Sequence, residues 1–175
     1  MYPLYKGGIR LKDTLCIYPG SFDPITLGHV DIIRRAAGIF SEVVVAVLRN
    51  PSKPGCFPIE KRLEMIQKAC GDIPNVLVDC FEGLLVDYMK EKHGTVVIRG
   101  LRAVSDFDTE FQMAQVNRQI YPHMETLFMM TSPQHAYISS SVVREIAAFG
   151  GEVASLVPES ILEDIHQKFP RSKAD

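Results

Sequence analysis

The sequence lacks the features that mark several classes of protein. Its longest obvious apolar run, residues 43–48, is far shorter than the roughly 18 apolar residues of a membrane-spanning helix, so we expect no membrane association. The basic residues near the start are not followed by an apolar segment, so we expect no secretory signal. There is no Walker loop, no Gly-x-Gly-x-x-Gly fingerprint, no internal repeat and no convincing Cys/His or Ser/His/Asp pattern. These absences argue against the common nucleotide loops and against covalent nucleophilic catalysis.

The sequence is also poor in net charge and in cysteine. Its 175 residues carry 19 Lys and Arg against 21 Asp and Glu, and the resulting net charge of −2 argues against a general nucleic-acid binder. Any anion site must therefore come from locally clustered cations. The four cysteines show no C-x-x-C spacing and lie in or beside apolar segments, which is typical of small core residues in a reducing compartment. We expect a cytoplasmic protein with a single domain.

Short apolar runs alternate with helical patterns along the chain. Strands are predicted at residues 15–18, 42–48, 76–78, 95–98 and 126–130, and helices at residues 30–40, 58–70, 83–92, 103–120, 142–149 and 159–169. This alternation predicts an α/β fold with a five-stranded parallel sheet and helices on both faces. Residues 14–170 are expected to form the domain, and residues 1–13 an extension outside the fold. In such sheets, ligands bind beyond the carboxyl ends of the strands.

The stretch 14–31 is the centre of the predicted site. It reads as a buried strand, a tight loop and the start of a helix, an arrangement in which backbone N–H groups and the positive end of a helix dipole converge on an anion. Gly28 leaves room for a ligand beside the backbone, and His29 is placed to direct an imidazole N–H at a phosphate oxygen. Ser21 lies in the same loop, where its hydroxyl either satisfies local backbone or contacts a ligand.

A pair of arginines follows the fourth predicted strand. Arg99 and Arg102, on either side of Gly100, offer two planar forks to phosphate oxygens, and the glycine lets a ligand approach the backbone. The alternative is that both arginines form surface ion pairs with the acidic residues that follow, Asp106, Asp108 or Glu110.

Two other loops carry polar groups at the ends of predicted strands. Ser139, Ser140 and Ser141 precede the helix 142–149; a helix cap, worth about 1 kcal/mol, explains one hydroxyl, and the other two suit an anion. Lys53 lies in a loop bracketed by prolines, which positions a side chain at low entropic cost. Without other information, a loop lysine is usually a solvated surface charge.

Two neighbouring motifs carry a family resemblance. Gly20-Ser21-Phe22-Asp23-Pro24, followed by Thr26-x-Gly28-His29, resembles the signature of the nucleotidylyltransferase superfamily, which implies a Rossmann-like fold. Because threonine rather than histidine stands at position 26, the chain resembles the phosphopantetheine adenylyltransferase family in particular. The likeness extends over residues 15–158 and includes Ile-Arg-Gly-Leu-Arg at 98–102 and Ile-Ser-Ser-Ser at 138–141.

The resemblance implies roles for particular residues. His29 and Ser21 are implied as catalytic residues that stabilise the transferred phosphate. Implied ATP contacts are Ser21, Phe22, His29, Gly100, Leu101, Arg102, Glu110, Tyr137, Ile138, Ser139, Ser140 and Ser141. Implied contacts to the phosphopantetheine acceptor are Ser21, Lys53, Leu85 and Arg99. The chain departs from the family at Pro54, where a second lysine is common, and at His135, where an aromatic residue is common.

The implied reaction is transfer of AMP from ATP to 4′-phosphopantetheine, which yields dephospho-coenzyme A and pyrophosphate. The acceptor phosphate is already ionised at neutral pH, so it attacks the α-phosphate in line, without a general base or a covalent enzyme intermediate. Mg²⁺ is implied as a cofactor bound through the ATP phosphates, with no dedicated protein metal site. The resemblance also implies a homohexamer and feedback binding of coenzyme A.

Three other interpretations stay open at this point. The nearest is a nucleotidylyltransferase that uses a mononucleotide or an alcohol phosphate as acceptor, although such relatives generally carry histidine where Thr26 stands. A class I aminoacyl-tRNA synthetase also has a Gly-His motif, but this chain has no room for tRNA-binding domains. A nucleotide-binding regulator without turnover would bind ATP and release no pyrophosphate.

Overall fold

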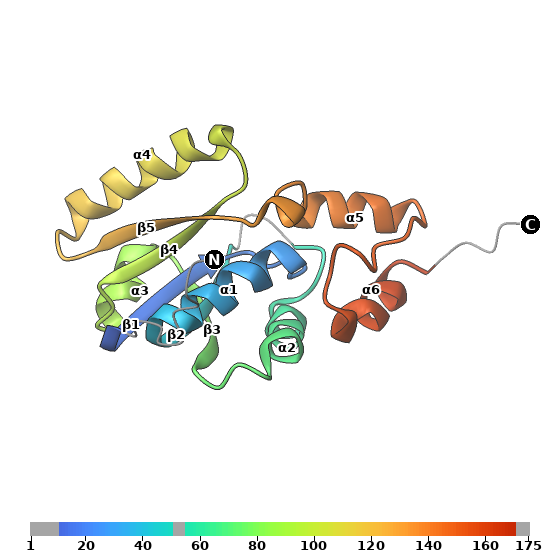
Figure 1. Ribbon diagram of the computed structural model, residues 1–175, viewed down its shortest axis with the longest axis horizontal. Coiled ribbons are helices and arrows are strands. Elements are labelled where there is room, and N and C mark those ends of the chain that lie inside the picture. Colours follow the sequence, from blue (N-terminus) through green and yellow to red (C-terminus); the bar gives the residue numbers. More distant parts are fainter. Residues whose placement is uncertain (1–10, 51–54, 171–175) are drawn as a thin grey trace, which may run out of the picture.

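A single parallel sheet forms the centre of the computed structural model, which describes residues 11–50 and 55–170. The strands are β1 (Leu11–Gly20), β2 (Phe40–Arg49), β3 (Val76–Glu82), β4 (Val96–Leu101) and β5 (Glu125–Met130). They lie in the order β3-β2-β1-β4-β5, and every pair is parallel (Figure 1). The five predicted strands and their parallel arrangement are confirmed.

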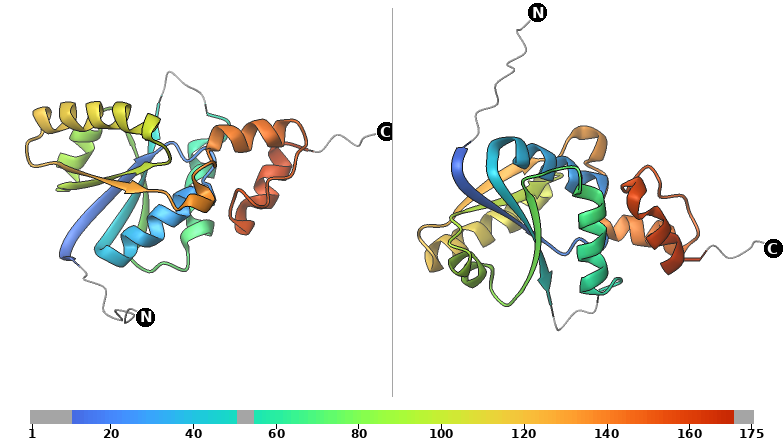
Figure 2. Two further views of the ribbon diagram at one scale, coloured as in Figure 1. Left: turned by 45° about the horizontal axis from the view of Figure 1, so that its top comes forward. Right: turned by 90° about the horizontal axis from the view of Figure 1, so that it is seen from below.

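Helices cover both faces of the sheet (Figure 2). They are α1 (Leu27–Ile39), α2 (Ile59–Cys70), α3 (Leu85–Glu91), α4 (Val104–Ile120), α5 (Ser140–Ala148) and α6 (Leu162–Lys168), with short 3₁₀ turns at Pro133–His135 and Glu159–Ile161. One apolar core packs α1 and α2 against one face and extends to α5 and α6 beyond the end of the sheet, and a second core packs α3 against the other face. Among the described residues, no helix is both long and apolar enough to cross a bilayer.

The structure extends several predicted elements. Strand β1 begins at Leu11, so the sheet includes residues that were expected in the N-terminal extension; residues 1–10 lie outside the described part of the chain. Helix α1 begins at Leu27 rather than at residue 30, and α5 begins at Ser140 rather than at residue 142. Both helices start early because a hydroxyl residue caps them, and a cap sets the first turn before any apolar periodicity appears.

Helix α4 lies where the sequence predicts a helix, but its side chains are not buried in the protomer. None of its residues, all of which lie in the described part of the chain, is buried. Its apolar side chains are instead partly exposed: Phe107, Phe111, Met113, Val116 and Ile120 are each 38–52% accessible. The helix therefore gains little from burial in the protomer, and other contacts must position it.

The strand order reverses between β1 and β4. Strands β2 and β3 follow on one side of β1, whereas β4 and β5 follow on the other. Loops that leave neighbouring strands in opposite directions open a crevice at the carboxyl edge of the sheet, and ligands of such folds bind there. The reversal therefore places the crevice between Gly20, the last residue of β1, and the Arg99–Arg102 segment.

Candidate active site

The loop between β1 and α1 forms one wall of the crevice. Thr26 caps α1: its hydroxyl accepts from the His29 backbone N–H at 3.4 Å, and the Thr26 backbone N–H donates to His29 Nδ1 at 3.1 Å. This reciprocal arrangement is a capping box with histidine in the place that glutamate or glutamine usually takes. Because Nδ1 accepts a hydrogen bond, the proton of the neutral ring lies on Nε2, and this N–H is available to a ligand.

The ring of His29 is held neutral and in one orientation. Burial, and to a smaller extent the positive charge of Arg102, together lower the pKa of His29 to about 4. The ring of Phe22 packs edge-on against it, with ring centroids 5.0 Å apart. Phe22 itself has a positive φ of 43°, a conformation that is costly for a bulky residue and that carries its ring into the core.

The two arginines of the opposite wall each pair with a carboxylate of α4. Arg99 donates from Nε and Nη2 to Glu110 at 2.5 and 2.6 Å, and from Nη1 to the Pro19 carbonyl at 3.1 Å. Arg102 donates from Nε and Nη2 to Asp106, both at 3.1 Å. Burial would raise the pKa of Asp106, but the hydrogen bonds from Arg102 outweigh it and hold that pKa below its ordinary value. The ion-pair alternative considered from the sequence is therefore present for both arginines.

The three serines at the start of α5 all have intramolecular partners. Ser139 is the N-cap, and its hydroxyl accepts from the Val142 N–H at 3.2 Å. Ser140 donates its hydroxyl to the Pro24 carbonyl at 2.8 Å, and Ser141 accepts from Arg144 at 3.3 Å. The expectation that capping explains only one hydroxyl is correct, but the other two are used to attach α5 to the β1–α1 loop and to Arg144.

Two adjoining cavities occupy the crevice. The polar cavity, of about 280 Å³, lies between the two walls and is lined by Tyr18, Ser21, Phe22, His29, Arg99, Gly100, Arg102, Ile138, Ser139, Ser140 and Ser141. The apolar cavity, of about 370 Å³, is lined by Leu48, Phe81, Leu84, Leu85, Met113 and Ala114, with Glu110 and Asn117 at polar positions. Ser21 and Arg99 line both cavities, so a ligand in one can meet a ligand in the other there.

Comparison with known proteins agrees with this geometry. The profile of the cytidylyltransferase-like family matches residues 17–146. A phosphopantetheine adenylyltransferase of Caldanaerobacter subterraneus is 52% identical over 158 residues, which cover 90% of this chain and 99% of that protein. One from Clostridium tetani is 54% identical over 154 residues, 88% of this chain and 96% of the relative. The chain belongs to the phosphopantetheine adenylyltransferase family.

The fold of this family member is also shared more widely. A Vibrio parahaemolyticus protein, provisionally assigned as a nicotinate-nucleotide adenylyltransferase, superposes with a TM-score of 0.64 at 15% identity. The match covers 91% of this chain and 98% of that one. At this level of identity the likeness concerns the fold alone. The Rossmann-like nucleotidylyltransferase fold expected from the sequence is confirmed.

Most of the residues expected at the adenylyltransferase site lie together. The two cavities collect Ser21, Phe22, His29, Leu85, Arg99, Gly100, Arg102, Glu110, Ile138, Ser139, Ser140 and Ser141. Leu101 is buried in the sheet and Tyr137 is 66% exposed, and neither is among the described residues that line the cavities. Lys53 and Pro54 lie outside the described residues. His135 belongs to the 3₁₀ turn that precedes the serines.

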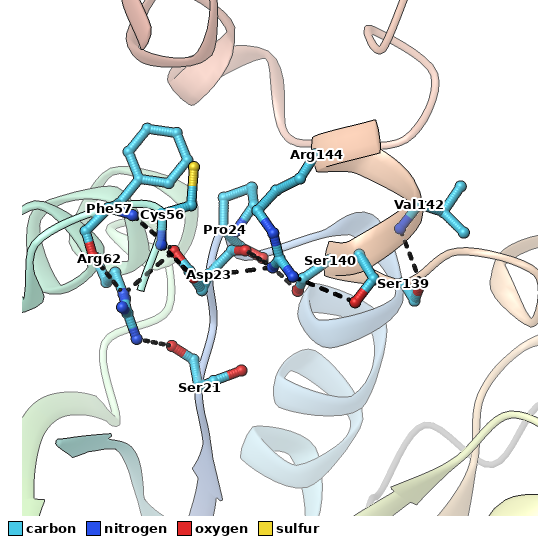
Figure 3. A network of polar contacts seen from close by, with 11 residues as sticks. Ser21, Asp23, Pro24, Cys56, Phe57, Arg62, Ser139, Ser140, Val142 and Arg144 are labelled. Atoms are coloured by element: carbon cyan, nitrogen blue, oxygen red, sulfur yellow. Dashed lines mark hydrogen bonds and ion pairs between the residues drawn. The ribbon is translucent and has the colours of Figure 1, made fainter. Parts of the chain in front are cut away.

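A buried ionic network behind the site was not predicted from the sequence. The Asp23 carboxylate accepts from the backbone N–H groups of Cys56 and Phe57 at 2.8 and 2.9 Å and pairs with Arg62 Nε at 3.3 Å. Arg144 donates to the Asp23 carbonyl (Figure 3). Asp23 and Arg62 are 7% and 6% exposed. The only signal in the sequence is an aspartate between Phe22 and Pro24, and no local pattern identifies its partners.

The same network reaches the active-site loop. Arg62 donates to the Ser21 carbonyl at 3.2 Å and to the Phe57 carbonyl at 2.7 Å. Arg62 thereby joins the β1–α1 loop to the segment before α2, and Arg144 and Ser140 join the same loop to α5 (Figure 3). Ser21, at the junction of the two cavities, is thus fixed from behind by a buried cation.

Proposed function

We propose that this protein transfers AMP from ATP to 4′-phosphopantetheine, forming dephospho-coenzyme A and pyrophosphate in the penultimate step of coenzyme A synthesis. The observation that carries the proposal is the pair of adjoining cavities, one polar and cationic, one apolar, which meet at Ser21 and Arg99. A triphosphate suits the polar cavity, and a long, largely apolar arm that ends in a phosphate suits the other. Membership of the family supports the same pair of substrates.

The proposed reaction depends on positioning the two substrates and not on proton transfer. An oxygen of the acceptor phosphate forms a bond to the α-phosphorus of ATP while the bond from that phosphorus to the β-bridging oxygen breaks, and the electron pair leaves with pyrophosphate. No proton has to be removed from the acceptor, so no base is required. The Nε2–H of His29 donates to an α-phosphate oxygen, where negative charge must be stabilised during transfer.

Cationic groups on the opposite wall bind the acceptor phosphate and the leaving pyrophosphate. In this proposal Arg99, which lines both cavities, binds the acceptor phosphate, and Arg102 with the first turn of α5 binds the departing pyrophosphate. Lys53 is proposed to join Arg99 at the acceptor. Mg²⁺ is proposed to enter as part of the MgATP substrate, bound through the triphosphate oxygens.

The decisive experiment is an assay of pyrophosphate release from MgATP with different acceptors. We expect release with 4′-phosphopantetheine, with dephospho-coenzyme A as the second product, and none with nicotinamide mononucleotide, nicotinate mononucleotide or no acceptor. Release of pyrophosphate only with a mononucleotide would support adenylyl transfer but would show that 4′-phosphopantetheine is not the acceptor. ATP binding without release under any condition would favour a regulator.

We also propose that the exposed apolar face of α4 and β5 is a self-association surface, in line with the homohexamer that the family resemblance implies. Helix α4 exposes Phe107, Phe111, Val116 and Ile120 at 38–52%, and Met130 at the end of β5 is 56% exposed. Exposed apolar side chains gathered in this way usually mark an interface. Native mass spectrometry should show that Val116→Lys lowers the subunit number, whereas Leu77→Lys, on the exposed edge strand β3, does not. Feedback binding of coenzyme A and a cytoplasmic location stay predictions.

A further inference from the structure

Helix α4 presents two carboxylates to the two arginines of the crevice. Asp106 and Glu110 are four residues apart and therefore lie one above the other on the same face of the helix. Asp106 meets Arg102, and Glu110 meets Arg99, each through two hydrogen bonds from one guanidinium. One helix thus contacts both Arg99, near the end of β4, and Arg102, which follows that strand.

The two ion pairs have the same geometry. In each, the carboxylate takes the edge of the guanidinium formed by Nε and Nη2. A guanidinium has five N–H donors in a rigid plane, so the edge formed by Nη1 and Nη2 keeps donors for a second planar or tetrahedral anion. Nη1 of Arg102 has no hydrogen-bond partner among the described residues, and Nη1 of Arg99 donates one bond to Pro19. Both arginines line the polar cavity.

Stability alone does not explain these pairs. The Arg102 and Asp106 side chains are 44% and 24% exposed, and those of Arg99 and Glu110 are 32% and 22% exposed. Ion pairs so accessible to water contribute little to folding. Because α4 buries none of its own residues, the pairs are specific contacts that fix the helix relative to β4 and, reciprocally, the arginines relative to α4.

We propose that Glu110 and Asp106 are positioning residues: each holds one arginine by its Nε/Nη2 edge so that the Nη1/Nη2 edge faces a substrate phosphate. Glu110 acts on Arg99 and thus on the acceptor, and Asp106 acts on Arg102 and thus on the triphosphate. The inference rests on the proposed function, since it takes its two phosphates from that reaction. It differs from the expectation that Glu110 contacts the nucleotide directly.

Two competing explanations predict different changes in the KM values of the two substrates. If Glu110 contacts ATP, its loss raises KM for ATP and leaves KM for the acceptor unchanged. If the carboxylates compete with phosphate for the arginines, their loss lowers KM for the corresponding substrate because the cation is released. The positioning explanation alone predicts that loss of Glu110 raises KM for the acceptor, whereas loss of Asp106 raises KM for ATP.

The test measures both KM values and kcat for Glu110→Gln, Asp106→Asn and a control, Asp108→Asn. Asp108 is an exposed acidic residue of the same helix, so the control removes the same charge without touching an arginine pair. We expect Glu110→Gln to raise KM for phosphopantetheine about tenfold, the scale of one charge-assisted hydrogen bond, with KM for ATP within twofold. Asp106→Asn should raise KM for ATP and leave KM for phosphopantetheine within twofold, and Asp108→Asn should change neither KM.

Melting temperatures and the wild-type assay separate the possible failures. Equal melting temperatures for the three variants would exclude a general structural effect, and Glu110→Asp should recover part of the loss if orientation is what matters. A raised KM for ATP in Glu110→Gln, or a lowered KM for the acceptor, would overturn the proposal. If the wild-type protein uses a different acceptor, the proposed function fails, and the same comparison of variants is then made with that acceptor.

Discussion

The two walls of the crevice are built from the same kind of interaction in different surroundings. On the wall formed by the β1–α1 loop, Asp23 and Arg62 pair at 6–7% exposure, and their side chains bond to the backbone of Ser21 and of the segment before α2. On the wall formed by β4 and α4, arginines pair with Asp106 and Glu110 at the surface. A buried pair determines where the chain goes, because breaking it leaves an unpaired charge, whereas an exposed pair can be altered at little cost to the fold.

The largest loss of stability is expected when the buried Asp23–Arg62 pair is broken. Asp23→Ala leaves Arg62 without its carboxylate and removes the acceptor of two backbone N–H groups. We expect a loss of about 3–5 kcal/mol in the free energy of unfolding. Asp106→Ala, the matched change on the exposed wall, should cost no more than about 1 kcal/mol. Urea denaturation of the two variants measures the difference; equal losses would contradict the comparison.

The second prediction separates the two roles of His29. His29→Ala removes the proposed donor to the α-phosphate and should lower kcat by about 10²–10³-fold, as the loss of one such donor does elsewhere. His29→Gln restores a standard capping box, so its stability should stay close to that of the wild type while kcat remains reduced. A loss of less than tenfold in folded His29→Ala would remove His29 from the mechanism.

The third prediction concerns the caps of the helices on the two walls. Ser139 caps α5 with a side-chain hydrogen bond, whereas α4 begins after Ala103, which has an extended conformation and no side chain able to cap. Ser139→Ala should therefore lower the free energy of unfolding by about 1 kcal/mol, and Ala103→Ser should raise it by a similar or smaller amount. Thermal denaturation measures both; a destabilising Ala103→Ser would show that the α4 start is limited by something other than its cap.

The fourth prediction concerns the pH dependence of stability. Because the folded pKa of His29 is about 4 and its unfolded pKa about 6.5, the unfolded chain binds more protons between these values. Stability therefore falls as pH falls from about 6.5 to 4, and the upper part of this interval lies above the range in which most carboxylates titrate. His29→Gln should lose less stability than the wild type over this interval. An identical slope in the two proteins would show that His29 is not held neutral by the fold.

Local patterns were sufficient for some elements and not for others. The buried runs of β2 and β4 and the helical periodicity of α2 were readable because each reflects a local repeat of apolar residues. The early starts of β1 and α1 could not be predicted in this way. Strand β1 begins early because its backbone pairs with β2, and α1 begins early because Thr26 caps it; both depend on groups outside the apolar pattern. For α4, the sequence indicated a helix but not that its apolar side chains stay exposed in the protomer.

Spacing and residue type were sufficient to predict the α/β fold, the parallel sheet, the motif around His29 and the two arginines at the carboxyl end of β4. Tertiary structure alone decided the partners: which carboxylate each arginine meets, that Asp23 is buried with Arg62, and that two cavities join at Ser21. These are contacts between residues brought together by the strand order β3-β2-β1-β4-β5. Strand order is a balance of packing over the whole chain, and no local stretch encodes it.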